Sequence, residues 1–196
     1  MSSPLRLAVI QGSTREGRLG PVVANWLRTH ADARPDMTVD LIDLAETPLP
    51  TVFPQLGQAP ADQADRALLR AVSPRLAAAD AFVVVTPEYN HSYPAALKNA
   101  IDWHNREWHA KPVAFVAYGG FSAGLRAVEH LRGVFAELHA VTIREAVGLQ
   151  GVWGQFDADG KATDPAADAA AKSMLDQLAW WGEALRDARA KKPYTA

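Results

Sequence analysis

Cysteine is absent from this chain of 196 residues. Without a thiol, the protein can form no disulfide, no thiolate metal site and no cysteine nucleophile. Long apolar runs are missing as well, since no stretch approaches the roughly 20 apolar residues that a membrane-spanning helix needs. The N-terminal residues lack the long apolar stretch of a signal peptide. Together these absences favour a cytoplasmic protein with no membrane partner.

The chain also has little excess charge of either sign, with a formal net charge of −2. Because nucleic-acid binding depends on an excess of basic residues, no nucleic-acid partner is expected. The histidines do not follow a metal-ligand spacing: His104 and His109 lie five residues apart, on different faces of a helix. No metal site is therefore predicted. The G-x-S-x-G motif of serine hydrolases is not found either.

What the chain does contain is apolar residues, which make up 48% of the sequence. That is enough for one complete core, so residues 1–196 are expected to form a single domain. Short apolar runs alternate with segments of helical periodicity, which predicts a parallel sheet covered by helices on both faces. The expected strands are 5–11, 37–44, 80–86, 112–118 and 140–143, and the expected helices are 21–31, 62–79, 94–103, 123–138 and 164–190.

Two segments between these elements are predicted to be irregular. Residues 45–60 are rich in proline and should form a loop, whereas Pro74 lies inside an otherwise helical segment and can kink it. Residues 151–164 form a polar insert before the last helix. Its Asp157-Ala158-Asp159-Gly160 stretch is typical of a surface turn, because the spaced acidic ligands and the final Glu of a calcium loop are missing.

The loop after the first strand, residues 12–20, reads GSTREGRLG. Free N–H groups and the positive end of a helix dipole meet there, and Ser13, Arg15 and Arg18 can bind phosphate oxygens. The lysine of a Walker A loop and the close glycine pair of a dinucleotide-binding turn are both absent. This composition fits a terminal phosphate monoester. A solvated turn whose arginines bind nothing is the alternative.

The loop after the third strand contains Pro87, Glu88, Tyr89 and Asn90. Glu88 could be a general base, but a positioning role is favoured because nothing in the sequence indicates a tuned pKa. Tyr89 can pack on a flat ligand or close the loop. Asn90 can hydrogen-bond the edge of a heteroaromatic ring or stabilise a turn.

The loop after the fourth strand begins with Gly119 and Gly120, whose N–H groups can point at a ligand without a Cβ in the way. Ser122 is the residue expected to cap the next helix, although it can also reach the ligand. In a flavodoxin-like sheet of order 2-1-3-4-5 the first, third and fourth strands are neighbours. The three loops should therefore meet at one edge of the sheet.

These three loops together resemble the NADPH-dependent FMN reductase family, a flavodoxin-like group. The resemblance rests on GSTREGRLG, TPEYNHSYPAALKNAIDW and YGGFSAGLRAVEHLR, and it covers the chain up to about Gln150. It implies a three-layer α/β/α sandwich that binds FMN, with the phosphate at the first loop and the ring at the other two. The candidate cofactor-binding residues are Ser13, Arg15, Arg18, Gly20, Pro87, Glu88, Tyr89, Asn90, Gly119, Gly120 and Ser122.

The resemblance also implies an activity. NADPH or NADH would pass a hydride to N5 of FMN, and the flavin would then reduce a quinone, an azo compound or a metal oxyanion in a ping-pong cycle. No catalytic residue is assigned, because the cofactor carries the chemistry. The alternatives are a flavodoxin-like electron carrier, a reductase of free FMN and a phosphate-sugar binding module. The physiological acceptor and the preferred nicotinamide stay open.

Members of this family are often dimers or tetramers, so a homodimer or homotetramer is expected here too. The segment Pro94 to Trp108 would lie near the subunit contact. Trp103 and Trp108 are compatible with such a contact, but they can equally belong to the core.

Overall fold

The computed structural model describes residues 3–55 and 58–195, and it contains a five-stranded parallel sheet of order β2-β1-β3-β4-β5. This is the predicted flavodoxin-like order. Residues 56–57 of the predicted loop, and residues 1–2 and 196 of the predicted domain, lie outside the described residues. The strands are β1 (Leu5–Gln11), β2 (Met37–Asp43), β3 (Ala81–Pro87), β4 (Pro112–Gly119) and β5 (Val141–Gln150). The helices are α1 (Gly20–Asp32), α2 (Gln63–Ala78), α3 (Ala95–Asp102), α4 (Leu125–Glu137) and α5 (Pro165–Lys191), with a short 3₁₀ turn, η1, at Val152–Gly154.

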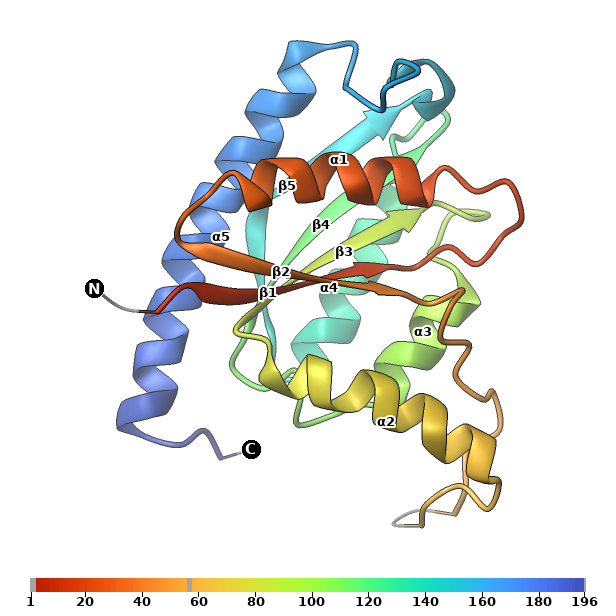
Figure 1. Cartoon of the computed structure of the whole chain (residues 1–196), viewed down its shortest axis with the longest axis vertical. Coiled ribbons are helices and arrows are strands. Elements are labelled where there is room, and N and C mark those ends of the chain that lie inside the picture. Colours follow the sequence, from red (N-terminus) through yellow and green to blue (C-terminus); the bar gives the residue numbers. More distant parts are fainter. Residues whose placement is uncertain (1–2, 56–57, 196) are drawn as a thin grey trace.

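The sheet is the middle layer of three, with α1 and α5 on one face and α2, α3 and α4 on the other (Figure 1). Side chains of a strand alternate between the two faces. Leu7 and Val9 of β1 therefore enter the core under α1 and α5, whereas Ala8 and Ile10 enter the core on the opposite face. Every residue of the central strand β3 is buried. This explains its unbroken apolar sequence.

Side-chain caps account for where the two longest helices begin. The side chains of Asp62 and Asp164 each accept a hydrogen bond from the backbone N–H two residues later, which caps α2 and α5. Helix α2 continues through Pro74 as far as Ala78. The predicted helix is therefore confirmed, and Pro74 lies in its last turns.

Strand β5 is longer than predicted, and this corrects the sequence analysis. The sequence pattern predicts an end at residue 143, but the strand pairs with β4 as far as Gln150. The register shifts between Val113 and Phe115, so that β5 contains extra residues opposite β4 at that point. Arg144 and Glu145 lie in this irregular stretch. Their polarity hides the strand from a pattern-based prediction.

The two tryptophans whose place was open have different environments. Trp108 is 1% exposed and packs edge-to-face against Phe82 and Phe135, so it belongs to the core. Trp103 is partly buried, and its Nε1–H donates to the carbonyl oxygen of Pro50 at 2.7 Å while its ring stacks on Phe53.

The polar insert contains the predicted surface turn. The carboxylate of Asp157 accepts hydrogen bonds from the N–H groups of Asp159 and Lys161, both at 2.9 Å, and Gly160 adopts a positive φ of 75°. In the part of the chain that the structure describes, no helix is both long and apolar enough to cross a membrane. The same residues contain no cluster of three potential metal ligands.

Candidate active site

A cavity of about 380 Å³ opens at the carboxyl ends of the strands. Four loops line it, so side chains far apart in the sequence meet there. The lining residues are Ser13 and residues 15–19 after β1, residues 87–89 after β3, residues 118–120 at the end of β4, and Val152 and Trp153 after β5. Its volume lies in the range of small-molecule sites.

Eight of the predicted site residues line this cavity: Ser13, Arg15, Arg18, Pro87, Glu88, Tyr89, Gly119 and Gly120. The other three, Gly20, Asn90 and Ser122, do not line it. Gly20 is the first residue of α1, where a Cβ atom would be 2.4 Å from Nε2 of Gln11 and 3.1 Å from the hydroxyl of Tyr118. A larger residue at this position would therefore displace the side chains of Gln11 and Tyr118, and Tyr118 lines the cavity.

Asn90 shapes the second loop. The N–H of Tyr89 donates to the carbonyl of Ser92 at 2.8 Å, and the N–H of Ser92 donates back at 3.0 Å. Between them Asn90 and His91 have positive φ angles of 48° and 76°, as a type I′ turn requires. The turn interpretation of Asn90 thus matches the backbone, and its effect is to position Tyr89.

Ser13 joins the first loop to the second. Its side chain is almost fully buried, and its hydroxyl lies 2.9 Å from the hydroxyl of Tyr89, so either group can donate. The backbone carbonyl of Ser13 accepts a hydrogen bond from Nε2 of Gln11 at 3.0 Å. Tyr89 therefore closes the loop, and its ring still lines the cavity.

The two arginines of the first loop differ in how they are held. Arg18 is mostly buried, and its Nη2 donates to the carboxylate of Asp43 at the end of β2, at 2.7 Å. Arg15 is exposed, and it forms no ion pair within the described residues. Asp43 thus orients one guanidinium in advance, whereas the other is free to turn toward a ligand.

Two buried polar atoms in this cavity lack a hydrogen-bonding partner within the described part of the chain: Nε of Arg18 and the hydroxyl of Tyr118. Burial raises the pKa of Tyr118, so its phenol stays protonated and can donate. Because leaving such groups unpaired in a protein interior costs free energy, a polar ligand that bonded to them would be favoured. The cavity therefore fits a ligand with phosphate or hydroxyl oxygens.

Glu88 is engaged by other protein groups. Its carboxylate accepts hydrogen bonds from the Ser122 hydroxyl at 2.6 Å, from the Arg126 N–H at 3.2 Å and from Nη1 of Arg126 at 3.3 Å. Burial opposes its ionisation, but these bonds outweigh burial and the pKa of Glu88 is lowered. A carboxylate held in this way is a poor base. The arrangement supports a positioning role, in which Glu88 ties the second loop to α4.

Ser122 is correspondingly not the helix cap that the sequence favoured. The N-cap of α4 is Gly124, which has a positive φ of 82° and no side-chain cap. The hydroxyl of Ser122 donates to Glu88 instead, and this contact connects residues that are 34 positions apart.

Sequence reasoning missed Tyr118 and Trp153. Trp153 is 75% exposed although it lines the cavity. The N–H of Gly151 donates to the carbonyl of Gly119 at 2.8 Å, which fixes η1 beside the third loop. The apolar alternation of Val147 and Leu149 could have indicated that β5 reaches the same edge, and hence that the residues after it belong to the site.

The parallel sheet has the order β2-β1-β3-β4-β5, the loop after β1 carries groups that can bind a phosphate, and a cavity opens at the carboxyl edge of the sheet. These features together define a flavodoxin-like nucleotide-binding protein. The chain belongs to the NADPH-dependent FMN reductase family, whose model matches residues 5–154. It is therefore a flavin-dependent NAD(P)H oxidoreductase with FMN as its cofactor.

Individual relatives agree with this assignment. The chain is 35% identical over 155 residues to an NAD(P)H-dependent FMN reductase of Schizosaccharomyces pombe, with 75% of this chain and 78% of the relative covered. It is 30% identical over 197 residues to a 2-hydroxy-1,4-benzoquinone reductase of Burkholderia sp, with 94% and 98% covered. Among solved structures, FerB, a flavoenzyme NAD(P)H:(acceptor) oxidoreductase from Paracoccus denitrificans, superposes with a TM-score of 0.74 at 26% identity, covering 92% of this chain and 98% of FerB.

Proposed function

We propose that this enzyme reduces a quinone-type acceptor in two half-reactions, with the nicotinamide and the acceptor using the same open side of the cavity in turn. FMN, when bound, supplies a ring that takes a hydride from the nicotinamide and passes it on. The observation that carries the proposal is the cavity itself, where four loops meet around two unpaired buried donors.

The residues of the first loop would hold the phosphate. Arg18 is already oriented by Asp43, and its unpaired Nε is the donor that an oxyanion would satisfy. Arg15 would add a second guanidinium, and Ser13 a hydroxyl, at the start of α1 where the helix dipole also favours an anion. Tyr118 would donate to an oxygen at the cavity floor.

The second and third loops would border the ring. Pro87, Tyr89, Gly119 and Gly120 line the cavity on this side, and a Cβ built on Gly120 would meet no atom within 4 Å. A flat ring can therefore approach this backbone closely. Backbone N–H groups at the pyrimidine edge would favour negative charge on the ring. Glu88, Asn90 and Ser122 would act indirectly, by keeping these loops in place.

The acceptor proposal rests on the relatives and on Trp153. One relative is named as a benzoquinone reductase, and a large exposed aromatic side chain at a cavity rim suits a planar substrate. We expect Trp153→Ala to raise the KM for a quinone several-fold while FMN affinity changes little. Steady-state kinetics and an FMN titration measure both quantities, and unchanged KM would exclude a role for Trp153. Azo compounds and metal oxyanions remain acceptors to assay beside the quinone.

A single anaerobic experiment tests the central proposal. The purified protein, loaded with FMN, should lose its yellow absorbance on addition of NADPH or NADH and regain it on addition of a quinone. Bound flavin that neither nicotinamide bleaches would indicate an electron carrier. Flavin that is released after each turnover would indicate a reductase of free FMN. A chain that fails to bind FMN would contradict all of these functions and leave the phosphate-sugar module.

We also propose that residues 1–196 act as one domain and that the protein assembles as a homodimer or homotetramer. Support for a contact near α3 comes from the stacked pair of Phe53 and Trp103, since Phe53 is exposed. Light scattering of the purified protein measures the mass, and a monomer at all concentrations would contradict the assembly.

A further inference from the structure

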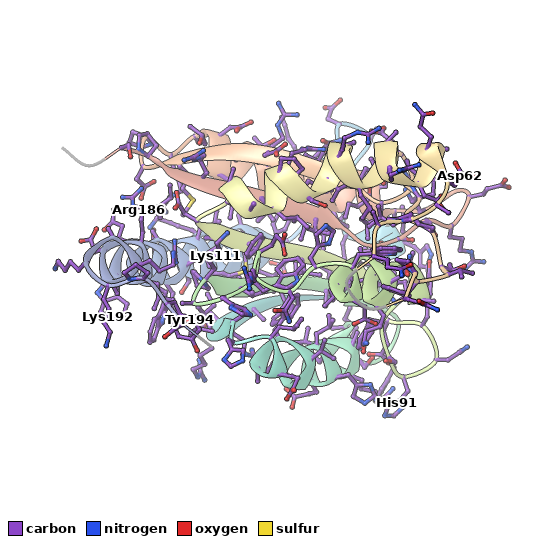
Figure 2. The ribbon with its side chains drawn as sticks, turned by 90° about the horizontal axis from the view of Figure 1, so that it is seen from below. Asp62, His91, Lys111, Arg186, Lys192 and Tyr194 are labelled. Atoms are coloured by element: carbon purple, nitrogen blue, oxygen red, sulfur yellow. The ribbon has the colours of Figure 1, made fainter. Side chains whose placement is uncertain are left out.

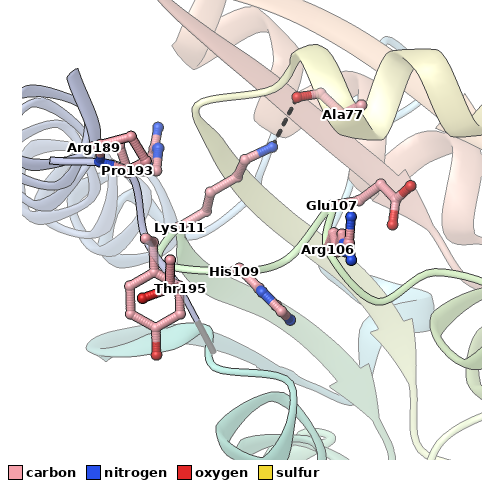
Figure 3. A pocket seen from close by; sticks show the side chains of 9 residues that line it. Ala77, Arg106, Glu107, His109, Lys111, Arg189, Pro193 and Thr195 are labelled. Carbon is pink, nitrogen blue, oxygen red and sulfur yellow. Dashed lines mark hydrogen bonds between the residues drawn. The ribbon is translucent and has the colours of Figure 1, made fainter.

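A second cavity, of about 650 Å³, lies at the opposite edge of the sheet, near the amino ends of β3 and β4 (Figure 3). It is an open cavity bordered by the end of α2, the loop between α3 and β4, and the C-terminal part of the chain. In Figure 2, Tyr194 and Arg186 lie at the end of the molecule away from His91, which belongs to the loop of the flavin site. The two cavities are therefore separate.

Lys111, the residue before β4, lines this second cavity although it is only 7% exposed. Its Nζ donates to the carbonyl oxygens of Leu76 at 3.1 Å and Ala77 at 2.9 Å, in the last turn of α2. These bonds use two of the three N–H donors of an ammonium group. Within residues 3–55 and 58–195, Lys111 forms no ion pair. Capping α2 thus leaves one N–H donor of Lys111 without a hydrogen-bonding partner within the described residues.

Further positive charge lines the same cavity. Arg106 is exposed and has no ion-pair partner within the described residues, and Arg189 shares the single carboxylate of Asp80 with Arg186. The lining contains one acidic residue, Glu107, whose Oε2 accepts a hydrogen bond from the N–H of Asn105 at 3.0 Å and whose charge offsets only part of these cations. Figure 3 shows Lys111 between Arg189 on one side and Arg106 on the other. The cavity therefore carries an excess of cationic groups.

His109 supplies a third kind of evidence. Its Nε2 is buried and unpaired, and the only other such side-chain atoms in the described chain are the two that line the flavin cavity. Burial, followed by the charges of His139 and Arg106, lowers the pKa of His109, so the ring is neutral near physiological pH. A neutral imidazole can donate one hydrogen bond from Nε2. Within the described residues, each of the two cavities that holds an unpaired buried side-chain atom also holds a cationic side chain without an ion pair.

We propose that this second cavity binds a small oxyanion, a phosphate or carboxylate group, between Lys111, Arg106 and Arg189, with His109 as an additional donor. Guanidinium and ammonium groups that converge and outnumber the carboxylates beside them are suited to such oxygens. The ring of Tyr194, fixed by a 2.9 Å hydrogen bond between its hydroxyl and Nδ1 of His139, forms one wall of the cavity. That wall admits an aromatic carboxylate as well as inorganic phosphate.

Calorimetric titration of the full chain, saturated with FMN, tests this site. FMN then occupies the phosphate position of the first cavity, and the variants below separate binding at the second cavity from binding on the open side of the flavin. We expect saturable binding of at least one of the two probes, at about millimolar Kd or tighter. Arg106→Gln should weaken that binding about 5- to 10-fold by removing an exposed charge without disturbing the core.

Arg70→Gln is the matched control, because Arg70 is an exposed arginine of α2 that does not line the cavity and has no ion pair within the described chain. Lys111→Met is a second variant, which should weaken binding further. Absence of saturable binding of both probes would overturn the proposal. Binding that is unchanged in both Arg106→Gln and Lys111→Met, or reduced equally in Arg70→Gln, would overturn it too.

Discussion

Arg15 is the residue of the flavin site whose contribution can be measured most cleanly, since no described partner depends on it. We expect Arg15→Ala to weaken FMN binding by about 1.5–3 kcal/mol if its guanidinium meets the phosphate. Fluorescence titration of the flavin gives the affinity. Arg28→Ala, which removes an exposed arginine of α1 paired only with Asp32, is the control and should bind FMN normally. Equal affinities for Arg15→Ala and the native protein would exclude the contact.

Glu88 illustrates a residue whose importance is structural and depends on pH. Since its folded-state pKa lies below the ordinary value of 4.5, its hydrogen bonds stabilise the fold above that pH and are lost as the pH falls through the lowered pKa. We expect Glu88→Gln to reduce the free energy of unfolding by about 1–2 kcal/mol near neutral pH, with a smaller difference in acid.

Urea denaturation at several pH values measures this difference. The control is Glu129→Gln, because Glu129 is exposed on α4 and its nearest cation is 3.9 Å away. A Glu88→Gln effect that is independent of pH would contradict the assignment of the stabilising bonds to the ionised carboxylate.

At the scale of elements, the start of α4 depends on a glycine. Gly124 has a positive φ of 82°, and a Cβ there would lie 2.6 Å from the backbone nitrogen of Tyr118. We expect Gly124→Ala to cost about 2–3 kcal/mol of stability and to loosen the third loop. The reason is that backbone atoms, unlike the end of a side chain, cannot move aside.

Gly133 provides the opposite case within the same helix. It is exposed, its φ is not positive, and a Cβ would meet nothing within 4 Å. Gly133→Ala should therefore stabilise the protein by about 0.5–1 kcal/mol. Thermal or urea unfolding compares the two variants, and a shift of the same sign for both would contradict this account of α4.

The elements also show what the sequence could predict. The strand order and the meeting of three loops follow from apolar runs and motifs, which are local features. The end of β5 was missed because a register shift with polar residues interrupts its pattern. The bond of Ser122 to Glu88 and that of Arg18 to Asp43 join distant positions, 34 and 25 residues apart. Such contacts form only when the fold brings the loops together, so no local sequence pattern predicts them.

At the scale of the whole molecule, we expect Lys111 to make the free energy of unfolding depend on pH. Burial, together with Arg189, lowers its pKa from 10.5 to about 8, while Asp80 and Glu107 act in the opposite direction. Between these values the unfolded chain binds more protons than the folded one, so the lysine's contribution to stability becomes more favourable as the pH rises. Relative to Lys111→Met, the native protein should gain about 3 kcal/mol over this range.

Denaturation of both proteins at matched pH values tests this, because all other titrating groups cancel in the difference. A difference that stays constant from pH 8 to 10.5 would show that the lysine titrates normally in the folded protein. The same measurement repeated with saturating phosphate should show a smaller gain, since an oxyanion beside Lys111 favours its charged form.

Strand β4 begins next to Lys111 and ends at Gly119, so a single stretch of backbone borders both cavities. Eight extended residues cover roughly 26 Å, and two occupants that far apart cannot touch. Their binding energies should simply add unless the strand itself shifts. A fluorinated Phe115, halfway along β4, would distinguish these cases by its fluorine NMR signal. A chemical shift that does not change when the second cavity is filled means that the two sites are independent. A changed chemical shift means that the strand moves and couples the two sites.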